Sequence, residues 1–136
     1  MKKLFKYWTP PLIWAVVIFL FSALPTARTS EIYWQDFIIK KLAHVIEYGV
    51  LSFFLYRGFI NTGTLRRNAA LYSILIALIY GATDELHQSF TPGREPRVRD
   101  VVFDTIGAIV AIYFIWNLLP KVPKKLRTWA KRLEVI

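Results

Sequence analysis

Ionisable side chains lie inside apolar stretches at three places in this sequence, and they are its best candidates for chemistry. At the first place, Lys41, His44 and Tyr48 follow one another at intervals of three and four residues. At 100° per residue these positions share one broad helical face, which Lys40 and Glu47 flank. Glu47 can pair with any of the neighbouring basic side chains. Such a pair can be purely structural, fixing the register of a helix while a lysine extends its ammonium group to a polar boundary.

The second place combines two adjacent carboxylates, an imidazole and an amide within five residues: Asp84, Glu85, His87 and Gln88. On a helix, Asp84 shares a face with either His87 or Gln88. The Pro92-Gly93 step that follows is typical of a turn and predicts the end of this helix, with Arg94 just beyond it. A solvated helix end explains acidic residues here, but it does not require an imidazole and an amide as well.

The third place is the start of the last apolar stretch, where Asp100 is followed four residues later by Asp104. Asp100 suits the cap of a helix N-terminus. Asp104 lies one turn deeper, where a charged side chain is costly unless it has a partner, water or a function. Small residues continue that side of the helix and predict close contact with a neighbouring helix: Gly107, Ala108 and Ala111.

The composition of the chain indicates what kind of elements must position these residues. The 136 residues are 55% hydrophobic and 16% aromatic, and a soluble domain of this size has too much surface for its volume to bury so much apolar area. A lipid bilayer removes that difficulty. The sequence contains no cysteine, which excludes disulfides and thiolate metal sites.

We therefore predict an all-α membrane protein with four transmembrane helices and a C-terminal amphipathic helix at the membrane interface. Helices are the expected spanning form because the apolar runs are too long and uniform for barrel strands. A cleaved signal peptide is the alternative explanation of the first span, although three further spans favour its retention. Residues 1–120 would form one transmembrane domain, and 121–136 a basic, amphipathic cytoplasmic tail. The spans are predicted at about residues 8–24, 37–60, 68–84 and 100–119.

The distribution of charge predicts that both termini lie in the cytoplasm. Under this topology 12 of the 18 Lys and Arg residues fall on the inner side, whereas eight of the nine acidic residues fall on the outer side or in the outer half of the membrane. An inner excess of Lys and Arg is usual for helical membrane proteins, so the net charge of +9 does not require a nucleic-acid partner. In the tail, apolar residues recur at helical spacing among lysines and arginines, which is typical of a helix lying on an anionic leaflet.

This topology brings the three polar places to one depth, because the end of the third span and the starts of the second and fourth all lie at the outer side. We predict a functional site there. Its candidate catalytic residues are His44, Glu47, Asp84, His87 and Asp104. Its candidate substrate-binding residues are Lys41, Tyr48, Glu85, Gln88, Arg94 and Asp100.

Three strings together resemble the VanZ-like family of bacterial membrane proteins: Lys41-x2-His44-x3-Tyr48, Asp84-Glu85-x-His87-Gln88-x-Phe90-x-Pro92-Gly93-Arg94, and Asp100-x3-Asp104-x2-Gly107. The similarity covers about residues 12–116, and the second string is its most specific part. The resemblance implies a four-helix, multi-pass protein of the bacterial cytoplasmic membrane and cell envelope, with a family link to glycopeptide resistance, particularly to teicoplanin. The sequence departs from the family pattern at Lys40, where an acidic residue is expected, and at Ala111, where glycine is frequent.

An anionic head group is the first ligand that suits this site. The phosphate or pyrophosphate of a lipid-linked cell-wall precursor would find positive charge in a basic rim: Lys41, Arg94, Arg97 and Arg99. A guanidinium group suits bidentate contact with such oxyanions. The expected partners are therefore membrane lipids, with no nucleic acid and with oligomerisation left open.

Two further functions and one structural explanation stand beside it. An enzyme acting on such a lipid would take its base from Glu47 or Asp84 and its general acid from one of the two histidines. A small oligomeric transporter would relay protons or ions through the same side chains. No metal or cofactor is expected, because recognised ligand spacings are absent and the basic residues would repel a cation. The structural explanation is an internal polar network with no ligand.

Overall fold

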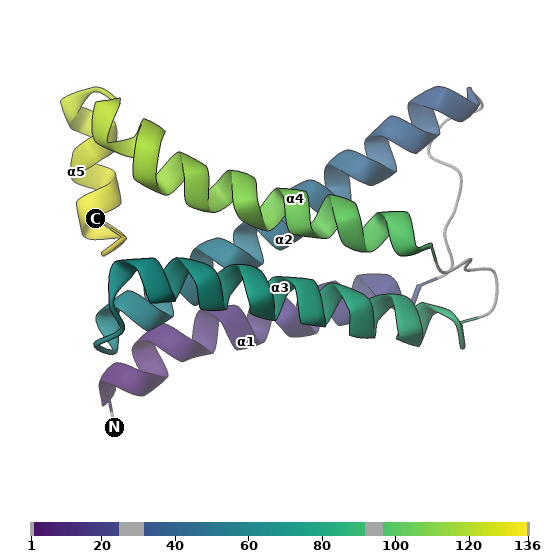
Figure 1. The fold of residues 1–136 in the computed structure, drawn as a ribbon, viewed down its shortest axis with the longest axis horizontal. Helices are drawn as coiled ribbons and strands as arrows, with labels where there is room; N and C mark the ends of the chain where they lie inside the picture. Colours follow the sequence, from purple (N-terminus) through teal and green to yellow (C-terminus); the bar gives the residue numbers. More distant parts are fainter. Residues whose placement is uncertain (1, 25–31, 92–96, 136) are drawn as a thin grey trace.

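In a computed structural model, the chain is described over residues 2–24, 32–91 and 97–135. Figure 1 shows α1 to α4 packed as a bundle, with α5 at one end. The all-helical prediction is confirmed for the described residues, where no strand occurs. A π-helical turn, Phe114–Leu118, and a 3₁₀ turn, Leu119–Lys121, continue α4. The helices are α1 (Lys2–Ser22), α2 (Tyr33–Asn61), α3 (Arg66–Gln88), α4 (Val98–Tyr113) and α5 (Lys124–Arg132).

Three helical segments are long and apolar enough to cross a membrane: Lys2–Ser22, Arg66–Gln88 and Val98–Lys121. The longest helix, α2, has 29 residues but is not among them. Charged residues interrupt its apolar sequence: Asp36, Lys40, Lys41, Glu47 and Arg57. On the outside of the bundle, large apolar side chains are exposed, among them Leu12 at 65% and Ile79 at 62%, as expected for surfaces that meet lipid rather than water. Length and composition thus support three spans where the sequence analysis predicts four.

The helices extend beyond the predicted spans at most of their ends. α1 begins at Lys2 and encloses Pro10 and Pro11, α2 begins at Tyr33, and α3 continues to Gln88. The predicted bounds follow the apolar windows of the sequence. A helix also accepts polar residues in its first and last turns, so it runs past the window on either side.

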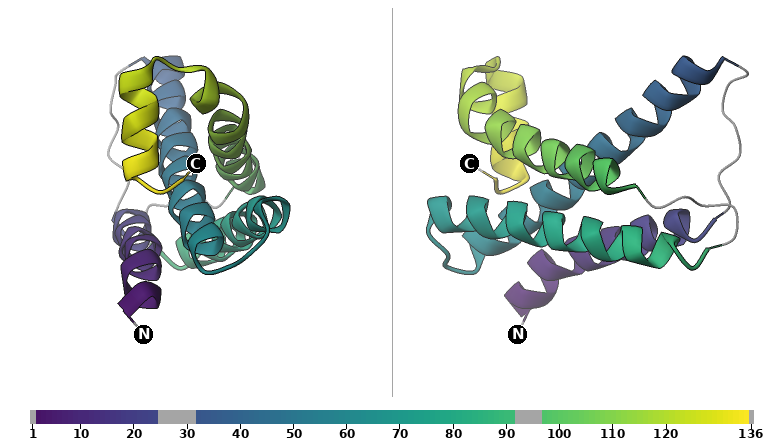
Figure 2. Two further views of the ribbon diagram at one scale, coloured as in Figure 1. Left: turned by 90° about the vertical axis from the view of Figure 1, so that its left-hand side faces the viewer. Right: turned by 45° about the vertical axis from the view of Figure 1, so that its right-hand side comes forward.

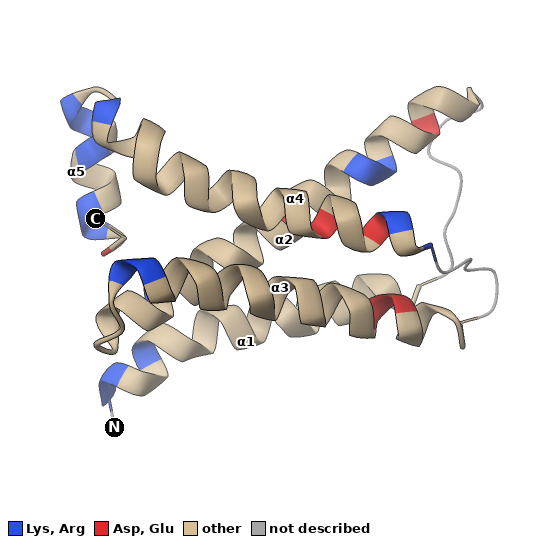
Figure 3. Ribbon diagram, in the orientation of Figure 1, with Lys and Arg blue, Asp and Glu red and all other residues tan. Residues whose placement is uncertain are grey.

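The two ends of the bundle differ in charge. The end of α1, the start of α2, the end of α3 and the start of α4 lie at the same end of the bundle, where the start of α2 splays away from α1 and α3 (Figures 1 and 2). Figure 3 shows most acidic residues in that half of the bundle, together with basic residues of α2 and α4, and basic residues of α1, α3 and α5 at the opposite end. We call the first the acidic end: Asp36, Glu47, Asp84, Glu85, Asp100 and Asp104. We call the second the basic end: Lys6, Arg57, Arg66, Arg67 and the lysines and arginines of α5.

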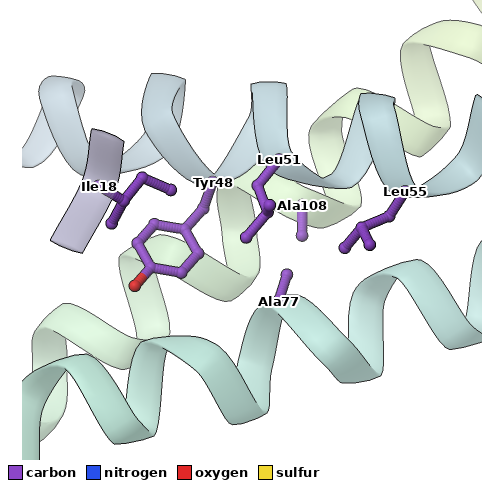
Figure 4. Close-up of a cluster of buried hydrophobic side chains, with 6 residues drawn as sticks. All are labelled: Ile18, Tyr48, Leu51, Leu55, Ala77 and Ala108. Carbon is purple, nitrogen blue, oxygen red and sulfur yellow. The ribbon is translucent and has the colours of Figure 1, made fainter. Parts of the chain in front are cut away.

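α2 and α4 cross in close contact because glycines lie at the crossing. A side chain at Gly107 would collide with the backbone carbonyl of Val45, and one at Gly49 would lie 3.3 Å from the carbonyl oxygen of Gly107. The predicted close contact along α4 is therefore present at Gly107. The four long helices share a buried apolar cluster beside this crossing, drawn in Figure 4: Ile18, Tyr48, Leu51, Leu55, Ala77 and Ala108.

The C-terminal segment is fastened to the basic end by polar contacts. Glu134 forms ion pairs with Lys6 at 2.8 Å and with Arg57 at 3.0 Å. Its backbone carbonyl accepts a hydrogen bond from Asn61 Nδ2 at 2.8 Å. The Lys6 ammonium lowers the pKa of the Glu134 carboxyl, so this group is ionised at neutral pH. Val135, next in the chain, is fully buried.

Figure 2 shows α5 lying across the basic end, transverse to the long helices. Ala130 of this nine-residue helix is buried against the end of the bundle. Leu126 and Trp129 remain 56% and 64% exposed. These two apolar side chains lie among five basic residues: Lys124, Lys125, Arg127, Lys131 and Arg132.

The crossing of α2 and α4 can be tested at its glycines. We expect Gly107→Ala to lower the free energy of unfolding by roughly 1–3 kcal/mol, because the added methyl group forces the helices apart at the Val45 carbonyl. Gly49→Ala is the matched comparison and should have a smaller effect, since a small shift relieves its 3.3 Å contact. Thermal unfolding of the purified variants in detergent measures both. Unchanged stability of Gly107→Ala would contradict this crossing geometry.

Candidate functional site

An ion pair and a histidine–carboxylate hydrogen bond join α2 to α4 at the acidic end. The Lys41 ammonium pairs with Asp100 Oδ1, and both residues are buried. One turn deeper, His44 Nδ1 lies 2.9 Å from Asp104 Oδ1, and Asp104 is fully buried. The pairs match because three residues on α2 and four residues on α4 both advance by about one helical turn. The two pairs thereby connect two successive turns of α2 to two successive turns of α4.

The inner pair gives His44 a defined orientation. When Asp104 is ionised, its Oδ1 accepts the hydrogen bond, Nδ1 carries the proton and Nε2 is left for another partner. A carboxylate that holds an imidazole in this way orients it for acid–base work. The His44 side chain is 15% exposed, so part of the ring remains accessible.

Aromatic rings surround the outer pair. The Lys41 ammonium lies 5.6 Å from the ring centroid of Phe37 and 5.8 Å from that of Phe103, distances at which a ring face attracts a cation. The Arg99 guanidinium lies 5.1 Å from the Phe37 centroid. Neither phenylalanine was selected from the sequence, although each lies one turn from a member of the pair on its own helix.

The end of α3 contributes three buried polar side chains. Gln88 Nε2 donates a hydrogen bond to Asp84 Oδ2 at 2.8 Å. Glu85 Oε2 accepts a hydrogen bond from the backbone N–H of Arg97 at 2.6 Å, directly before α4 begins at Val98. Glu85 therefore links the end of α3 to the start of α4. A negative charge there interacts favourably with the positive end of the α4 helix dipole.

Gly81 makes room for Asp104 against α3. A Cβ at this buried glycine would lie 2.9 Å from Asp104 Oδ2, closer than real contacts allow. Gly81 was not predicted as part of the site. A glycine inside an apolar helix is nevertheless a signal that another group approaches its backbone.

His87 faces a different neighbour from the rest of the cluster. Its ring centroid lies 4.5 Å from that of Phe19 on α1, and its Nδ1 is buried without a hydrogen-bond partner among the described residues. Gln88, rather than His87, contacts Asp84. The structure thus decides between the two residues that helical periodicity left open.

Glu47 and Arg94 are the remaining predicted site residues. Glu47 is half-buried on α2, and its backbone carbonyl accepts a hydrogen bond from Trp14 Nε1 of α1 at 2.8 Å. Lys40, one of the basic residues considered as its partner, forms an ion pair with Asp36 at 2.8 Å. Arg94 lies outside the described residues.

Besides His87 Nδ1, three further buried polar atoms of the cluster have no hydrogen-bond partner among the described residues: Tyr48 OH, Asp104 Oδ2 and Glu85 Oε1. Tyr48 is fully buried. Leaving such an atom unsatisfied costs about 1–3 kcal/mol, and buried polar groups in folded proteins are generally hydrogen-bonded. The cluster therefore has unused hydrogen-bonding capacity at its centre.

A shallow hollow adjoins the cluster at the start of α4. It is lined by Tyr33, Arg97, Val98 and Arg99. Arg99 connects it to the outer ion pair, since its Nε lies 4.0 Å from Asp100 Oδ1. Within residues 2–24, 32–91 and 97–135, no three His, Asp or Glu side chains form a candidate metal-binding group.

Apolar helices of spanning length that enclose paired charges near one end define a class, the helical membrane proteins with a buried polar site. The chain belongs to the VanZ/LLP1 family, whose sequence model matches residues 4–119. This match confirms the predicted family. The apolar helices of spanning length agree with the membrane location that the resemblance implies. No curated protein and no solved structure was found to match the chain.

The outer ion pair can be tested by a cycle of variants. We expect Lys41→Met alone to lower the free energy of unfolding by about 3–5 kcal/mol, because Asp100 is then buried without its counter-charge. The double variant Lys41→Met/Asp100→Leu should recover most of this loss, since apolar side chains often replace a buried pair at little cost. Unfolding of the two single variants and the double variant in detergent measures the coupling.

Lys40→Met is the matched control for this cycle. It removes the lysine of the more exposed pair with Asp36, so its effect should stay below about 1 kcal/mol. A double variant no more stable than Lys41→Met would show that Asp100 does not depend on Lys41.

Proposed function

We propose that the protein spans the bacterial cytoplasmic membrane four times, with both termini in the cytoplasm. The 29 residues of α2 reach about 43 Å at 1.5 Å per residue, so this helix is long enough to span. Lys41 and His44 near its outer end pair with α4, and Arg57 near its inner end pairs with Glu134. Pairing reduces the cost that otherwise excludes such charges from an apolar phase.

The separation of charge supports this orientation. The basic end would face the cytoplasm, in keeping with the usual inner excess of Lys and Arg. α5 would then lie on the inner leaflet, with Leu126 and Trp129 directed to the acyl boundary and its basic residues near anionic head groups. The acidic end would face outward.

We further propose that the acidic end is a site that binds or modifies an anionic, phosphorylated, lipid-linked substrate of the cell envelope. The hollow lined by Arg97 and Arg99 at the start of α4 carries this proposal, and the unsatisfied buried atoms of Tyr48, Asp104 and Glu85 beside it add unused hydrogen-bonding capacity. A network that served only to hold α2 against α4 would satisfy its own members, as Lys41 and Asp100 do. The buried atoms that lack hydrogen-bond partners one turn deeper favour a role in binding a ligand.

The phosphate group of such a substrate would lie in the hollow at the start of α4. Arg97 and Arg99 supply guanidinium groups there and Tyr33 a hydroxyl, which are donors that oxyanions bind well. The Arg99 side chain is 47% exposed and is therefore accessible from the membrane surface. Lys41 is already paired with Asp100, so it would act on the substrate through that pair.

Modification of the substrate would use the pair of His44 and Asp104. Asp104 holds the ring through Nδ1, and Nε2 would take the proton of a water or hydroxyl that attacks the phosphorus atom. The protonated ring would then return that proton to the departing oxygen. Binding without modification would use the same contacts and no proton transfer.

The resemblance to VanZ-like proteins implies a link with glycopeptide resistance, teicoplanin included. A site that binds or modifies a lipid-linked wall precursor at the outer face of the cytoplasmic membrane is one physical basis for such a link. On this proposal, the ligand rather than the fold would connect the protein to the antibiotic.

A small proton- or ion-coupled transporter is the second candidate, and one observation favours it. Carboxylates outnumber basic side chains in the cluster: Asp84, Glu85, Asp100 and Asp104 against Lys41 and His44. An excess of buried carboxylates suits the transfer of protons or cations. Such a transporter would work as an oligomer, because four helices are few for alternating access.

The absence of cysteine allows the orientation to be tested with single introduced thiols. Val98→Cys should react with a membrane-impermeant maleimide in intact cells, because the exposed side chain of Val98 lies at the proposed outer end. Thr128→Cys in α5 should react only after the cells are permeabilised. The reverse pattern would overturn the orientation and, with it, the outward-facing site.

Arg99→Gln tests the ligand class. Native mass spectrometry of the purified protein should show a retained phosphorylated lipid, and retention should fall about tenfold in this variant, because one charge-assisted hydrogen bond is lost. His44→Ala should keep the lipid and abolish any turnover of it. Arg67→Gln, at an exposed arginine in the first turn of α3, is the matched control. Equal retention by Arg99→Gln and Arg67→Gln would rule out the hollow as the phosphate site.

A further inference from the structure

We propose that the basic end holds a separate binding site for a phosphate monoester, and that the side chain of Glu134 occupies this site in the structure. Lys6 of α1 and Arg57 of α2 form the site, because both pair with the Glu134 carboxylate. The ligand is a phosphate group with two ionisable oxygens, carried by a lipid head group or free in solution. The site lies at the opposite end of the bundle from the proposed outer site and does not depend on it.

Two cations from different helices converge on one carboxylate. Lys6 Nζ lies 2.8 Å from Glu134 Oε1, and Arg57 Nη2 lies 3.0 Å from Oε2. Both cations also lie over the ring of the buried residue Tyr7, at 4.9 Å and 5.0 Å from its centroid. Cations held this close to one another repel unless an anion lies between them. These contacts therefore define an anion site.

The oxygens that Arg57 binds are arranged as two oxygens of a phosphate group would be. Arg57 Nε donates a hydrogen bond to the backbone carbonyl of Leu133 at 2.7 Å, while Nη2 donates to the Glu134 carboxylate. The guanidinium group thus uses two neighbouring N–H groups, the bidentate contact with which arginine binds phosphate. A phosphate supplies both oxygens from one group and a third oxygen for Lys6.

The charge of the site favours a phosphate monoester over a carboxylate. Glu134 is the one acidic side chain among the described residues of the basic end, and its single negative charge faces the two cations Lys6 and Arg57. A phosphate monoester carries a charge of about −1.5 to −2 at pH 7, so it neutralises both cations. A phosphate diester brings only one negative charge.

The backbone of Glu134 indicates that its carboxylate can be exchanged for another anion. The N–H of Glu134 bonds to the carbonyl of Lys131 at 3.0 Å, and that of Val135 to the carbonyl of Ala130 at 3.3 Å, which is the pattern of a Schellman turn. Glu134 has a φ of 57°, where glycine is the usual residue because other side chains are strained. Release of the carboxylate lets the turn unwind and relieves this strain.

A ligand reaches the site without opening the bundle. The Lys6 side chain is 54% exposed and that of Glu134 32%. Only the segment that follows α5 has to move, and it is held by Glu134 and by the fully buried Val135. The protein would therefore have a closed form with Glu134 in the site and a second form with phosphate there and Val135 exposed.

Glu134→Gln tests the site by removing the charge of its internal occupant. The full-length protein in detergent is titrated with short-chain phosphatidic acid, a phosphate monoester, and followed by native mass spectrometry. We expect the variant to bind it about tenfold more tightly, the factor by which a competitor bound about nine-tenths of the time lowers the apparent affinity. Glu134→Gly provides a second variant, because it removes the carboxylate and suits the φ of 57°.

Matched variants connect this gain to the two cations. In the Glu134→Gln background, Arg57→Gln should lower the affinity about tenfold, since a charge-assisted hydrogen bond is lost. Arg67→Gln removes the same charge from an exposed arginine of α3 and should keep the gain. Asp36→Asn, which removes a carboxylate at the acidic end, should produce no gain in the parent protein.

Inorganic phosphate distinguishes the two sources of the ligand. Displacement of the bound lipid by inorganic phosphate would identify the phosphate group alone as the ligand, and retention of the lipid would identify a lipid head group. The proposal stands in either case. Phosphatidylglycerol with the same acyl chains is a diester and should gain less from Glu134→Gln than phosphatidic acid does. An equal gain would overturn the assignment to a monoester.

A thiol at position 135 tests whether the ligand displaces the chain's own carboxylate. The sequence has no cysteine, so Val135→Cys places a single thiol at a fully buried position. Its reaction with a maleimide should be about tenfold faster when phosphatidic acid saturates the protein, because the closed form then falls to roughly a tenth of its former share. An unchanged rate at saturation would show that the ligand binds elsewhere.

Three further outcomes would overturn the proposal. These are unchanged affinity in both Glu134→Gln and Glu134→Gly, an equal gain in Asp36→Asn, and equal losses in Arg57→Gln and Arg67→Gln. Arg99→Gln, at the outer hollow, should leave the gain unchanged. Failure of the outer site and failure of this one are therefore distinguishable.

Discussion

A charged side chain is held in an apolar phase only beside its counter-charge, and this constraint organises the described chain. Lys41 and His44 enter an otherwise apolar bundle on α2, and two aspartates of α4 meet them at matching intervals. That match requires the two helices to approach closely, which Gly107 permits at their crossing. α2 thereby combines the length of a spanning helix with a composition that is unusual for one.

Both ends of α2 are fixed by charge, and its middle is fixed by packing. At the basic end, the carboxylate of Glu134 pairs with Arg57 of α2 and with Lys6 of α1, so one group holds two helices and the C-terminal segment together. In the middle, Leu51 and Leu55 of α2 pack on small residues of α3 and α4. The register of α2 is therefore set at three heights, and a change at one height is opposed at the other two.

Helical periodicity placed the polar residues of the second and fourth spans each on one helical face, because they recur at intervals of three and four, and the predicted topology brought these faces to one depth. It did not assign neighbours, since adjacent residues such as His87 and Gln88 differ by 100° and only the positions of α1 and α4 decide between them. The partner of Glu85 is a backbone N–H, a group that nearly every residue carries and no sequence pattern marks. The requirement for glycine at position 81 arises from the approach of the Asp104 side chain from α4, which the sequence alone does not show. Hydropathy similarly located the apolar parts of the helices and missed their polar ends.

The two pairs, Lys41 with Asp100 and His44 with Asp104, differ in how completely their polar atoms are hydrogen-bonded. Lys41 and Asp100 neutralise one another, and aromatic rings close around the ammonium group, so this pair needs nothing further to fix the register of two helices. One turn deeper, Asp104 gives one oxygen to His44 and keeps the other unsatisfied, as Tyr48 keeps its hydroxyl. A fold gains no stability from such atoms in an apolar interior. The proposed function assigns these atoms to a ligand, and on that proposal the outer pair would position the inner pair at the binding site.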